Sequence, residues 1–164
     1  MTAKTMQELL RTNPQVGQVR WMAVRPTPRT EVELCQQIEM DTEQGLLGDH
    51  FRGKPGSKRQ VTLIQFEHIE VVEKILGQSI DPSLLRRNIV VAGINLQSLK
   101  NQEFSIGEAL LFGTGNCPPC SRMEENLGPG GYNAMRGHGG LTARVVRSGV
   151  VNLGDQVVAV NSIE

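Results

Sequence analysis

The chain has 164 residues, of which 17 are lysine or arginine and 17 are aspartate or glutamate, so its formal net charge is zero. A neutral chain lacks the broad basic field that general nucleic-acid binders and membrane-surface binders need, so we expect no nucleic-acid and no membrane partner. With 38% hydrophobic residues the chain should fold unaided, and its length suits a single domain over residues 1–164 with a core at about 15–160.

The number of cysteines and the lengths of the apolar runs indicate in which cellular compartment the protein is expected. Three cysteines are too few for a disulfide framework and favour a reduced, cytoplasmic setting. The first ten residues contain no apolar run long enough for a signal peptide, and no segment approaches the roughly 18 apolar residues of a transmembrane helix. We therefore expect no membrane-spanning segment.

Hydrophobic spacing in the first half of the chain predicts a short helix and then strands around one longer helix. Met6, Leu9 and Leu10 are spaced for a short amphipathic helix within an arm of residues 1–13. The segment 31–40 alternates as a strand, and its glutamate-bearing face should be solvated. The predicted elements are a strand at 17–25, a strand at 31–40, a loop at 45–58, a strand at 61–64, a helix at 66–76 ended by Gly77, and a helical turn starting at Asp81 and Pro82.

The second half of the chain predicts short strands separated by turns. The predicted elements are a strand at 88–91, a turn and strand within 103–112, a short helix at 119–127, a glycine-rich loop at 130–140, and strands at 141–147 and 156–160. The 18 glycines and 8 prolines indicate many turns, which favour short strands over long helices. We predict a mainly β fold, a mixed β-barrel of short strands with a few short helices.

The segment from Cys117 to Cys120, Cys-Pro-Pro-Cys, admits three interpretations. Half of a zinc site would need further ligands, and the other cysteine and the three histidines show no second paired spacing. A thioredoxin-like redox pair would follow a strand within a βαβ pattern, which we do not find in the sequence. The third interpretation is a single reactive thiolate, Cys120, at the start of a helix.

This third interpretation has a physical basis. The prolines before Cys120 and the helix after it would place the sulfur near unpaired backbone N–H groups, and Arg122 adds positive charge nearby; both favour thiolate over thiol. A thiolate is both a nucleophile and a soft metal ligand. An inert buried cysteine is the plain alternative, and these residues alone leave both open.

Basic and glycine-rich segments could add an anion-binding pocket. Arg86 and Arg87 enter an apolar strand beside Asn88, and arginine suits bidentate phosphate binding, although such a pair more often lies on a solvated edge. The glycine-rich run 128–140 lacks Rossmann or P-loop spacing. It could bring backbone amides and Arg136 to an anion, or it could be a plain flexible loop.

Two further segments are ambiguous in the same way. Arg59, next to a lysine and just before a strand, could join a basic pocket or be exposed. His50 follows Gly48 and Asp49 in a loop, where a lone histidine is more often structural than catalytic.

Taken in order, these segments resemble the MOSC domain, found at the C-terminus of molybdenum cofactor sulfurases and in small stand-alone proteins. The resemblance covers roughly residues 15–160. The segments that carry it are Gly48-Asp49-His50, Arg86-x-Asn88-Ile89 with Gly93, Phe104-x-Ile106-Gly107, Pro119-Cys120-x-Arg122-Met123, Arg136-Gly137, Gly140, Arg144-Val145, Gly149 and Gly154-Asp155.

The resemblance implies a β-rich barrel with Cys120 as its hallmark cysteine. In relatives that reduce N-hydroxylated compounds that cysteine ligates molybdenum in a pterin cofactor, so Cys120 is expected to be both catalytic residue and metal ligand. Arg86 and Asn88 are expected to hold the phosphate and the polar edge of the pterin. Further cofactor-binding residues are expected at Arg59, Arg122, Arg136, Gly137 and Gly140.

Three functions remain open at this point. The first is a molybdenum-pterin-dependent reductase of N-hydroxylated substrates; because the chain is shorter than those reductases and lacks their N-terminal β-barrel half and a ferredoxin-like tail, we expect another protein to donate the electrons. The second is a sulfur carrier that receives sulfur as a Cys120 persulfide from a pyridoxal-phosphate-dependent desulfurase, for assembly of metal–sulfur centres. The third is a small-molecule binding module without turnover.

Overall fold

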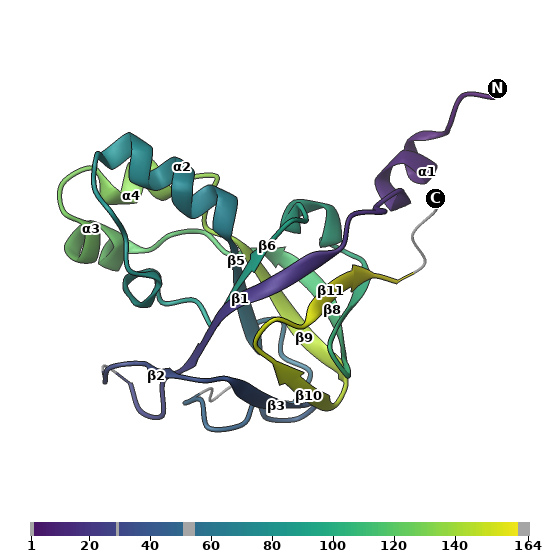
Figure 1. The fold of residues 1–164 in the computed structure, drawn as a ribbon, viewed down its shortest axis with the longest axis horizontal. Coiled ribbons are helices and arrows are strands. Elements are labelled where there is room, and N and C mark those ends of the chain that lie inside the picture. The colour runs from purple at the N-terminus through teal and green to yellow at the C-terminus, as the bar shows by residue number, and fades with distance from the viewer. Residues whose placement is uncertain (1, 29, 51–54, 161–164) are drawn as a thin grey trace.

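A closed β-barrel dominates the computed structural model, which describes residues 2–28, 30–50 and 55–160 (Figure 1). Around the barrel the strands are β11 (Gln156–Ala159), β7 (Glu103–Ile106), β8 (Ala109–Asn116), β9 (Leu141–Arg147), β5 (Val61–Gln65), β6 (Ile89–Ala92) and β1 (Gly17–Val24). β1 closes the barrel by pairing with β11, at Gly17 with Val157 and Gln18 with Gln156. The predicted mixed β-barrel with few short helices is therefore confirmed.

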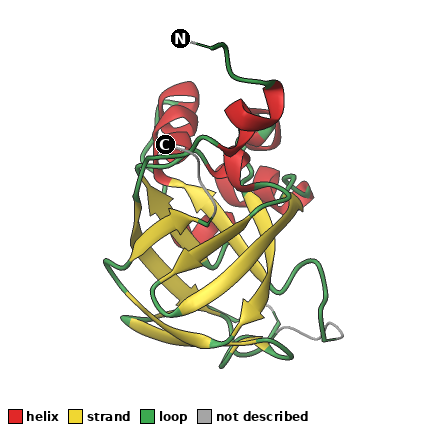
Figure 2. Cartoon of the chain, turned by 90° about the vertical axis from the view of Figure 1, so that its right-hand side faces the viewer, coloured by secondary structure: helices red, strands yellow, loops and turns green. Residues whose placement is uncertain are grey.

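Shorter elements complete the fold. A second sheet is formed by β10 (Gly149–Asn152), β3 (Gln37–Asp41) and β4 (Gly45–Leu46), and β2 (Glu33–Leu34) extends the barrel sheet at β1. The helices are α1 (Met6–Arg11), α2 (Phe66–Leu76), α3 (Ser121–Leu127) and α4 (Gly131–Met135), with 3-10 turns η1 (Pro82–Leu85) and η2 (Leu96–Leu99). Figure 2 shows the strands as one body with helices gathered at one end. No helix in the described ranges is long and apolar enough to span a membrane.

The parallel pair β5–β6 gives the barrel its mixed character. Parallel neighbours need a crossover, and α2 with η1 supplies it. The chain therefore does contain a βαβ unit, contrary to the expectation from its sequence. The cysteine segment lies outside that unit: it follows β8, which pairs antiparallel with β7 and β9. All residues of β5 are buried, as expected for a strand covered on both faces.

Two clusters of buried apolar side chains hold the barrel and its helices together. The first fills the barrel, with fully buried side chains that include Met22, Leu63 and Phe104. The second lies between the barrel wall and the helices, where Ile64 of β5 meets Met123 of α3 and residues of α2 and α4. Through Met123, α3 is thereby held against the barrel wall.

Several predicted elements match the structure closely. The helix at 66–76 has its predicted bounds, and Gly77 ends it in the left-handed conformation at φ 68°. Asp81 accepts a hydrogen bond from the backbone N–H of Ser83, as a helix N-cap does. The other elements confirmed, within a residue or two at each end, are α1, β1, β5, β6, α3, β9 and β11.

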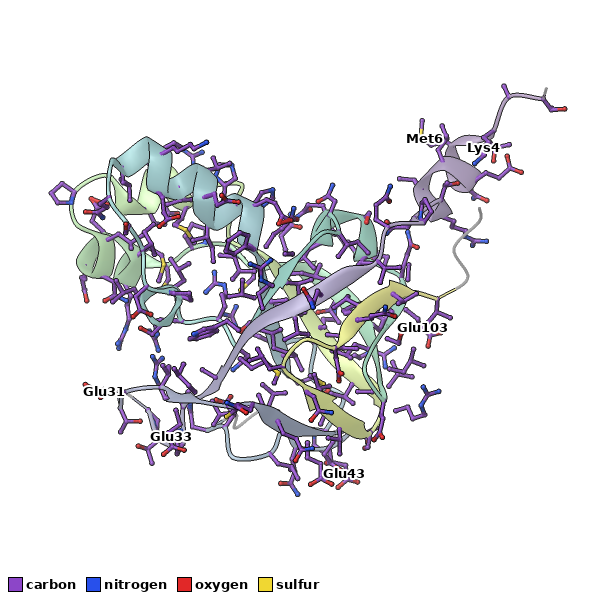
Figure 3. All side chains as sticks on the ribbon, viewed as in Figure 1. Lys4, Met6, Glu31, Glu33, Glu43 and Glu103 are labelled. Carbon is purple, nitrogen blue, oxygen red and sulfur yellow. The ribbon has the colours of Figure 1, made fainter. Side chains whose placement is uncertain are left out.

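Other predictions were wrong in detail. The segment 31–40 is two strands, because β2 pairs with β1 whereas β3 pairs with β10 and β4; Leu34 is consequently 70% exposed. Its glutamates are exposed as expected, and Figure 3 shows Glu31 and Glu33 at the outer edge of the molecule. In 103–112 we expected a turn followed by a strand; β8 does follow the turn, but a further strand, β7, precedes it.

Three further short elements were not predicted from the local sequence. The loop predicted at 45–58 begins with β4, and its residues 51–54 lie outside the described residues. The glycine-rich segment 130–140 contains α4, because Glu124 of α3 accepts hydrogen bonds from the N–H groups of Gly130 and Tyr132 at the start of that helix. The segment 149–152 is a strand, β10, because β3 offers it a partner.

We predict that protonation of His68 weakens the fold. The ring of His68 on α2 lies edge-to-face with that of His138 after α4, with ring centroids 5.2 Å apart. Burial, and then the neighbouring His138, lower the pKa of His68. The folded protein therefore takes up this proton less readily than the unfolded chain, so stability present above the ordinary histidine pKa of about 6.5 falls as the pH drops through it.

Urea unfolding at about pH 7.5 and about pH 5.5 measures this effect. The loss of unfolding free energy at the lower pH should be smaller in His68→Gln than in the wild type. An unchanged pH dependence in His68→Gln would contradict the assignment.

Candidate functional site

A buried guanidinium positions the cysteine segment. Arg87 is 5% exposed. Its Nε donates to the carbonyl of Gly139 at 2.8 Å, Nη1 to Leu85 at 3.1 Å, and Nη2 to Cys117 at 3.1 Å and Pro118 at 3.3 Å. Within the described ranges no carboxylate lies within 4.0 Å of Arg87, so carbonyl dipoles solvate its charge. Burial lowers the pKa of Arg87, and the neighbouring Cys117 opposes that shift.

This arrangement corrects one expectation for the arginine pair. A solvated edge is the usual place for two such residues, but Arg87 is buried and joins three segments of chain. Arg86, directly before it, is half-buried and faces a pocket instead. The two arginines separate because Arg86 adopts the left-handed conformation, with φ 60°, at the end of η1.

The same contacts separate the two cysteines of the motif. Cys117 is 1% exposed, and its N–H donates to the carbonyl of Gly140 at 2.9 Å. Cys120 occupies the N-cap of α3, where it is exposed and makes no side-chain capping hydrogen bond. All three cysteines are free thiols, and burial raises the pKa of the third, Cys35. Cys120 is therefore the thiol most accessible to a ligand.

Close packing of two glycines explains part of the glycine-rich loop. A Cβ on Gly139 would overlap the carbonyl oxygen of Cys117, and a Cβ on Gly140 would overlap that of Leu63 in β5. Gly140 also has φ +99°, which favours glycine. These glycines therefore let the loop lie directly against the cysteine segment and the barrel wall.

Cys120 borders a pocket of about 310 Å³. Three of the predicted cofactor-binding residues, Arg59, Arg86 and Asn88, line the same pocket. Arg87, which the sequence offered only as a possible phosphate-binding partner of Arg86, also borders this pocket. No cofactor-binding role was predicted for the other lining residues: Ala23, Val24, Arg25, Val32, Asp49, His50, Gln60 and Thr62. Arg25 could have been suspected only from its place at the end of a predicted strand.

The charge at this pocket is mainly positive. Burial lowers the pKa of Arg86 most, Arg122 and Arg25 lower it further, and Cys120 opposes the shift. Mutual repulsion of guanidinium groups is costly unless an anion lies between them. Together with the left-handed backbone of Arg86, this indicates a binding site, since strained residues tend to cluster at such places.

Polar side chains fix the floor of the pocket. The Oδ1 atom of Asn88 accepts hydrogen bonds from the N–H of Thr62 at 3.0 Å and from its hydroxyl at 2.9 Å. The hydroxyl in turn accepts from the N–H of Asn88 at 3.1 Å. Asn88 therefore joins the start of β6 to β5, and its amide Nδ2 is the part of the side chain directed at β1, 3.5 Å from the carbonyl of Ala23.

The rim of the pocket is tied to the end of β1. Asp49 Oδ1 accepts from the N–H of Arg25 at 2.8 Å, and the N–H of His50 donates to the carbonyl of Arg25 at 2.8 Å. His50 Nδ1 also lies 2.8 Å from that carbonyl, so Nδ1 carries a proton and Nε2 is left for other partners.

The remaining predicted residues lie elsewhere. Arg122, on α3, lines a neighbouring groove. Arg136 and Gly137 are exposed after α4 and are absent from the lining of both cavities, while Gly140 is buried against β5. A cofactor-binding role for these last three stays a prediction.

Comparisons with known proteins agree with this fold. A family model described as the MOSC domain matches residues 35–158. The YuaD protein from Bacillus subtilis has a TM-score of 0.76 at 19% identity, covering 89% of this chain and 97% of that one. YiiM from Geobacillus stearothermophilus has a TM-score of 0.72 at 18% identity, covering 88% and 75%. YiiM from Escherichia coli has a TM-score of 0.65 at 17% identity, covering 90% and 71%. No curated protein gives a significant match.

We predict that Arg87→Met destabilises the protein by about 2–4 kcal/mol, because buried carbonyls lose a charged donor. Urea unfolding measures this loss. Arg86→Met is the matched control: Arg86 is half-buried and donates no hydrogen bond within the described ranges, so its loss should cost less than about 1 kcal/mol. Equal losses in the two variants would show that the hydrogen bonds of Arg87 to the four carbonyls, the Arg87 clamp, contribute nothing to stability.

We also predict that Gly139→Ala displaces the cysteine segment, because the added Cβ meets the Cys117 carbonyl. The rate at which a thiol reagent modifies Cys120 should change several-fold, and the unfolding free energy should fall. Gly137→Ala is the control in the same loop, since nothing lies within 4 Å of its Cβ position and only left-handed strain of about 1–2 kcal/mol is added. A Cys120 rate that changes equally in both variants would contradict this role of Gly139.

Proposed function

We infer the function of this chain from the premise that it belongs to the MOSC domain family. We propose that it binds a molybdenum-pterin cofactor through Cys120 and reduces N-hydroxylated compounds. The observation that carries the proposal is the position of one exposed thiol at a pocket bordered by the guanidinium groups of Arg25, Arg59 and Arg86.

The donor set of the pocket fits such a group. Among the residues the structure describes, no three histidine, cysteine or acidic side chains are grouped to hold a metal ion by themselves. A metal at Cys120 would therefore receive one soft thiolate from the protein and its other ligands from the cofactor. The arginines suit the anionic part of a phosphorylated pterin.

The chain's own residues would divide the work. Arg59 and Arg86 would bind the anionic groups, and Arg86 would also shield the charge of a Cys120 thiolate. Thr62 and Asn88 satisfy one another and so present a fixed surface to the ligand. Nδ1 of His50 donates to the carbonyl of Arg25, and within the described ranges no hydrogen bond engages Nε2, so we propose that Nε2 holds or delivers a proton.

The proposed reaction requires an external source of electrons. When bound, the molybdenum centre would supply two-electron redox chemistry. Breaking the N–O bond of an N-hydroxylated compound consumes two electrons and two protons and releases the amine and water. We propose that a separate electron-donor protein supplies the electrons, and that His50 passes a proton to the leaving oxygen.

The exposure of Cys120 also supports a second candidate, a sulfur carrier. A pyridoxal-phosphate-dependent desulfurase that carries a persulfide would be the donor. The Cys120 thiolate would attack the outer sulfur, the desulfurase thiolate would leave, and Cys120 would hold the sulfur as a persulfide. An exposed cysteine is required because two proteins must bring their sulfur atoms into contact.

We predict that protein from a host that makes the cofactor contains molybdenum, and that Cys120→Ser lowers the content at least about tenfold because the sulfur ligand is lost. Elemental analysis of the purified protein measures it. Cys35→Ser is the control, since Cys35 does not line the pocket. Molybdenum absent from the wild type, or equal in wild type and Cys120→Ser, would reject the reductase.

The carrier is tested on the same proteins. Mass spectrometry after incubation with a desulfurase and cysteine should find one added sulfur on the wild type and none on Cys120→Ser. A wild type that gains no sulfur would reject the carrier.

A further inference from the structure

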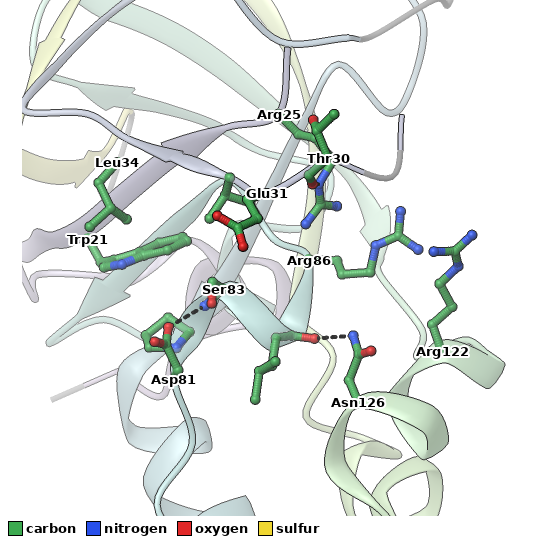
Figure 4. Close-up of a pocket in the computed structure, with 13 residues that line it drawn as sticks. Trp21, Arg25, Thr30, Glu31, Leu34, Asp81, Ser83, Arg86, Arg122 and Asn126 are labelled. Atoms are coloured by element: carbon green, nitrogen blue, oxygen red, sulfur yellow. Dashed lines mark hydrogen bonds between the residues drawn. The ribbon is translucent and has the colours of Figure 1, made fainter. Parts of the chain in front are cut away.

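A second cavity adjoins the Cys120 pocket and shares its residues Arg25, Val32 and Arg86. It is an open groove of about 830 Å³ between β1, the segment 30–34, η1 and α3. Figure 4 shows Trp21 and Leu34 at one end of the groove and the side chains of Arg86 and Arg122 at the other. The family resemblance gave a role to none of the residues at the Trp21 end.

The arginine end lacks negative partners. Arg25, Arg86 and Arg122 line the groove together, and each of the other two lowers the pKa of Arg86, so their charges are close enough to repel. Nε of Arg25 donates to the carbonyl of Thr30 at 2.8 Å, which fixes that side chain and leaves its two terminal nitrogens available. In the part of the chain that the structure describes, no carboxylate lies within 4.0 Å of any of the three guanidinium groups.

The opposite end is apolar and open. Trp21 is half-buried, packed on one side against the apolar cluster under the helices. Leu34 beside it is 70% exposed, although leucine ordinarily gains by burial. Pro82 of η1 belongs to the same lining. An aromatic ring between these side chains would bury the exposed apolar area.

Two acidic side chains also line the groove. Asp81 is the N-cap of η1, and its carboxylate accepts a hydrogen bond from the N–H of Ser83 at 2.9 Å. Glu31 is exposed, on the rim between the two ends, and would keep a negative group away from the Trp21 end. The electrostatics thereby orient a ligand, with its anionic group at the arginines.

We propose that this groove binds a planar aromatic anion, with the ring against Trp21 and Leu34 and the carboxylate or phosphate at Arg25, Arg86 and Arg122. The volume suits a ligand of at least two fused rings. Its use as the substrate subsite beside Cys120 rests on the proposed function, whereas binding itself does not. The N-hydroxylated substrates of the proposed reductase would then be aromatic compounds that carry a negative charge.

The only tryptophan of the chain gives a direct readout. In ¹⁵N-labelled full-length protein prepared without molybdenum, the indole N–H of Trp21 gives a single resonance. Titration with 2-naphthoate should shift this resonance, and 2-naphthamide, which has the same shape without the charge, should bind at least about tenfold more weakly, because a charged hydrogen bond is lost.

Substitutions test separately the arginine contact with the ligand's carboxylate and the Trp21 contact with its ring. Arg122→Gln should bring the two affinities within about threefold of each other. Arg147→Gln, which removes the same charge at an exposed position on β9 outside the groove, should leave the preference intact. Trp21→Leu should weaken both ligands, as followed by the backbone N–H resonance of Ser83.

Three outcomes would overturn the proposal: no shift of the indole resonance, equal affinities in the wild type, or naphthoate shifts confined to the N–H groups of Asp49 and Asn88 in the neighbouring pocket. The molybdenum content of the same wild type and variants, purified instead from a host that makes the cofactor, tests the proposed function separately. Naphthoate binding without molybdenum, or molybdenum without naphthoate binding, therefore identifies which of the two ideas fails.

Discussion

The site depends on one buried positive charge. The Arg87 guanidinium is surrounded by carbonyl oxygens from three stretches of chain that are distant in sequence: the end of η1, the cysteine segment and the glycine-rich loop. Burying a cation is costly, and hydrogen bonds to several carbonyl dipoles offset the cost only if all those segments are in place together. The guanidinium therefore makes the ordering of each segment depend on the others. Through its hydrogen bond to Pro118 it also determines where Cys120 lies and where α3 begins.

The neighbouring arginine shows how one turn of backbone divides structure from binding. Arg86 adopts the left-handed conformation, which costs an L-residue roughly 1–2 kcal/mol, and this turn directs consecutive side chains to opposite sides. Arg87 enters the interior, while Arg86 joins Arg25 at the boundary between the Cys120 pocket and the groove. The strain is sustained because Arg87, Asn88 and η1 hold the flanking residues by hydrogen bonds.

The fold was predictable where local signals agree with tertiary pairing. The helix that Gly77 ends and the fully buried strand at 61–64 carry strong local patterns, so their bounds follow from sequence. The strands β2, β4 and β10 have two to four residues each, and only their partners distinguish them from turns. Helix α4 was hidden for a similar reason, because the carboxylate that caps it comes from Glu124 on another helix.

The site was predictable in part. Cys120, Arg59, Arg86 and Asn88 do line one pocket, and the motif order suggested them. The clamp by Arg87 could not be foreseen, since its acceptors are backbone carbonyls, which carry no sequence signal. The roles of Gly139 and Gly140 were also hidden, because a glycine required by close packing looks the same in sequence as one in a flexible loop.

Closure of the barrel by its first and last strands has a consequence for biosynthesis. β1 and β11 meet at Gly17 and Val157, and β1 also pairs with β6. During translation β1 can join β6 early, but the cylinder stays open until Gln156–Ala159 has left the ribosome. A nascent chain paused before that point exposes an unpaired edge of β7, a surface open to wrong pairing with other chains. Such long-range closure also predicts slow folding for a protein of this size.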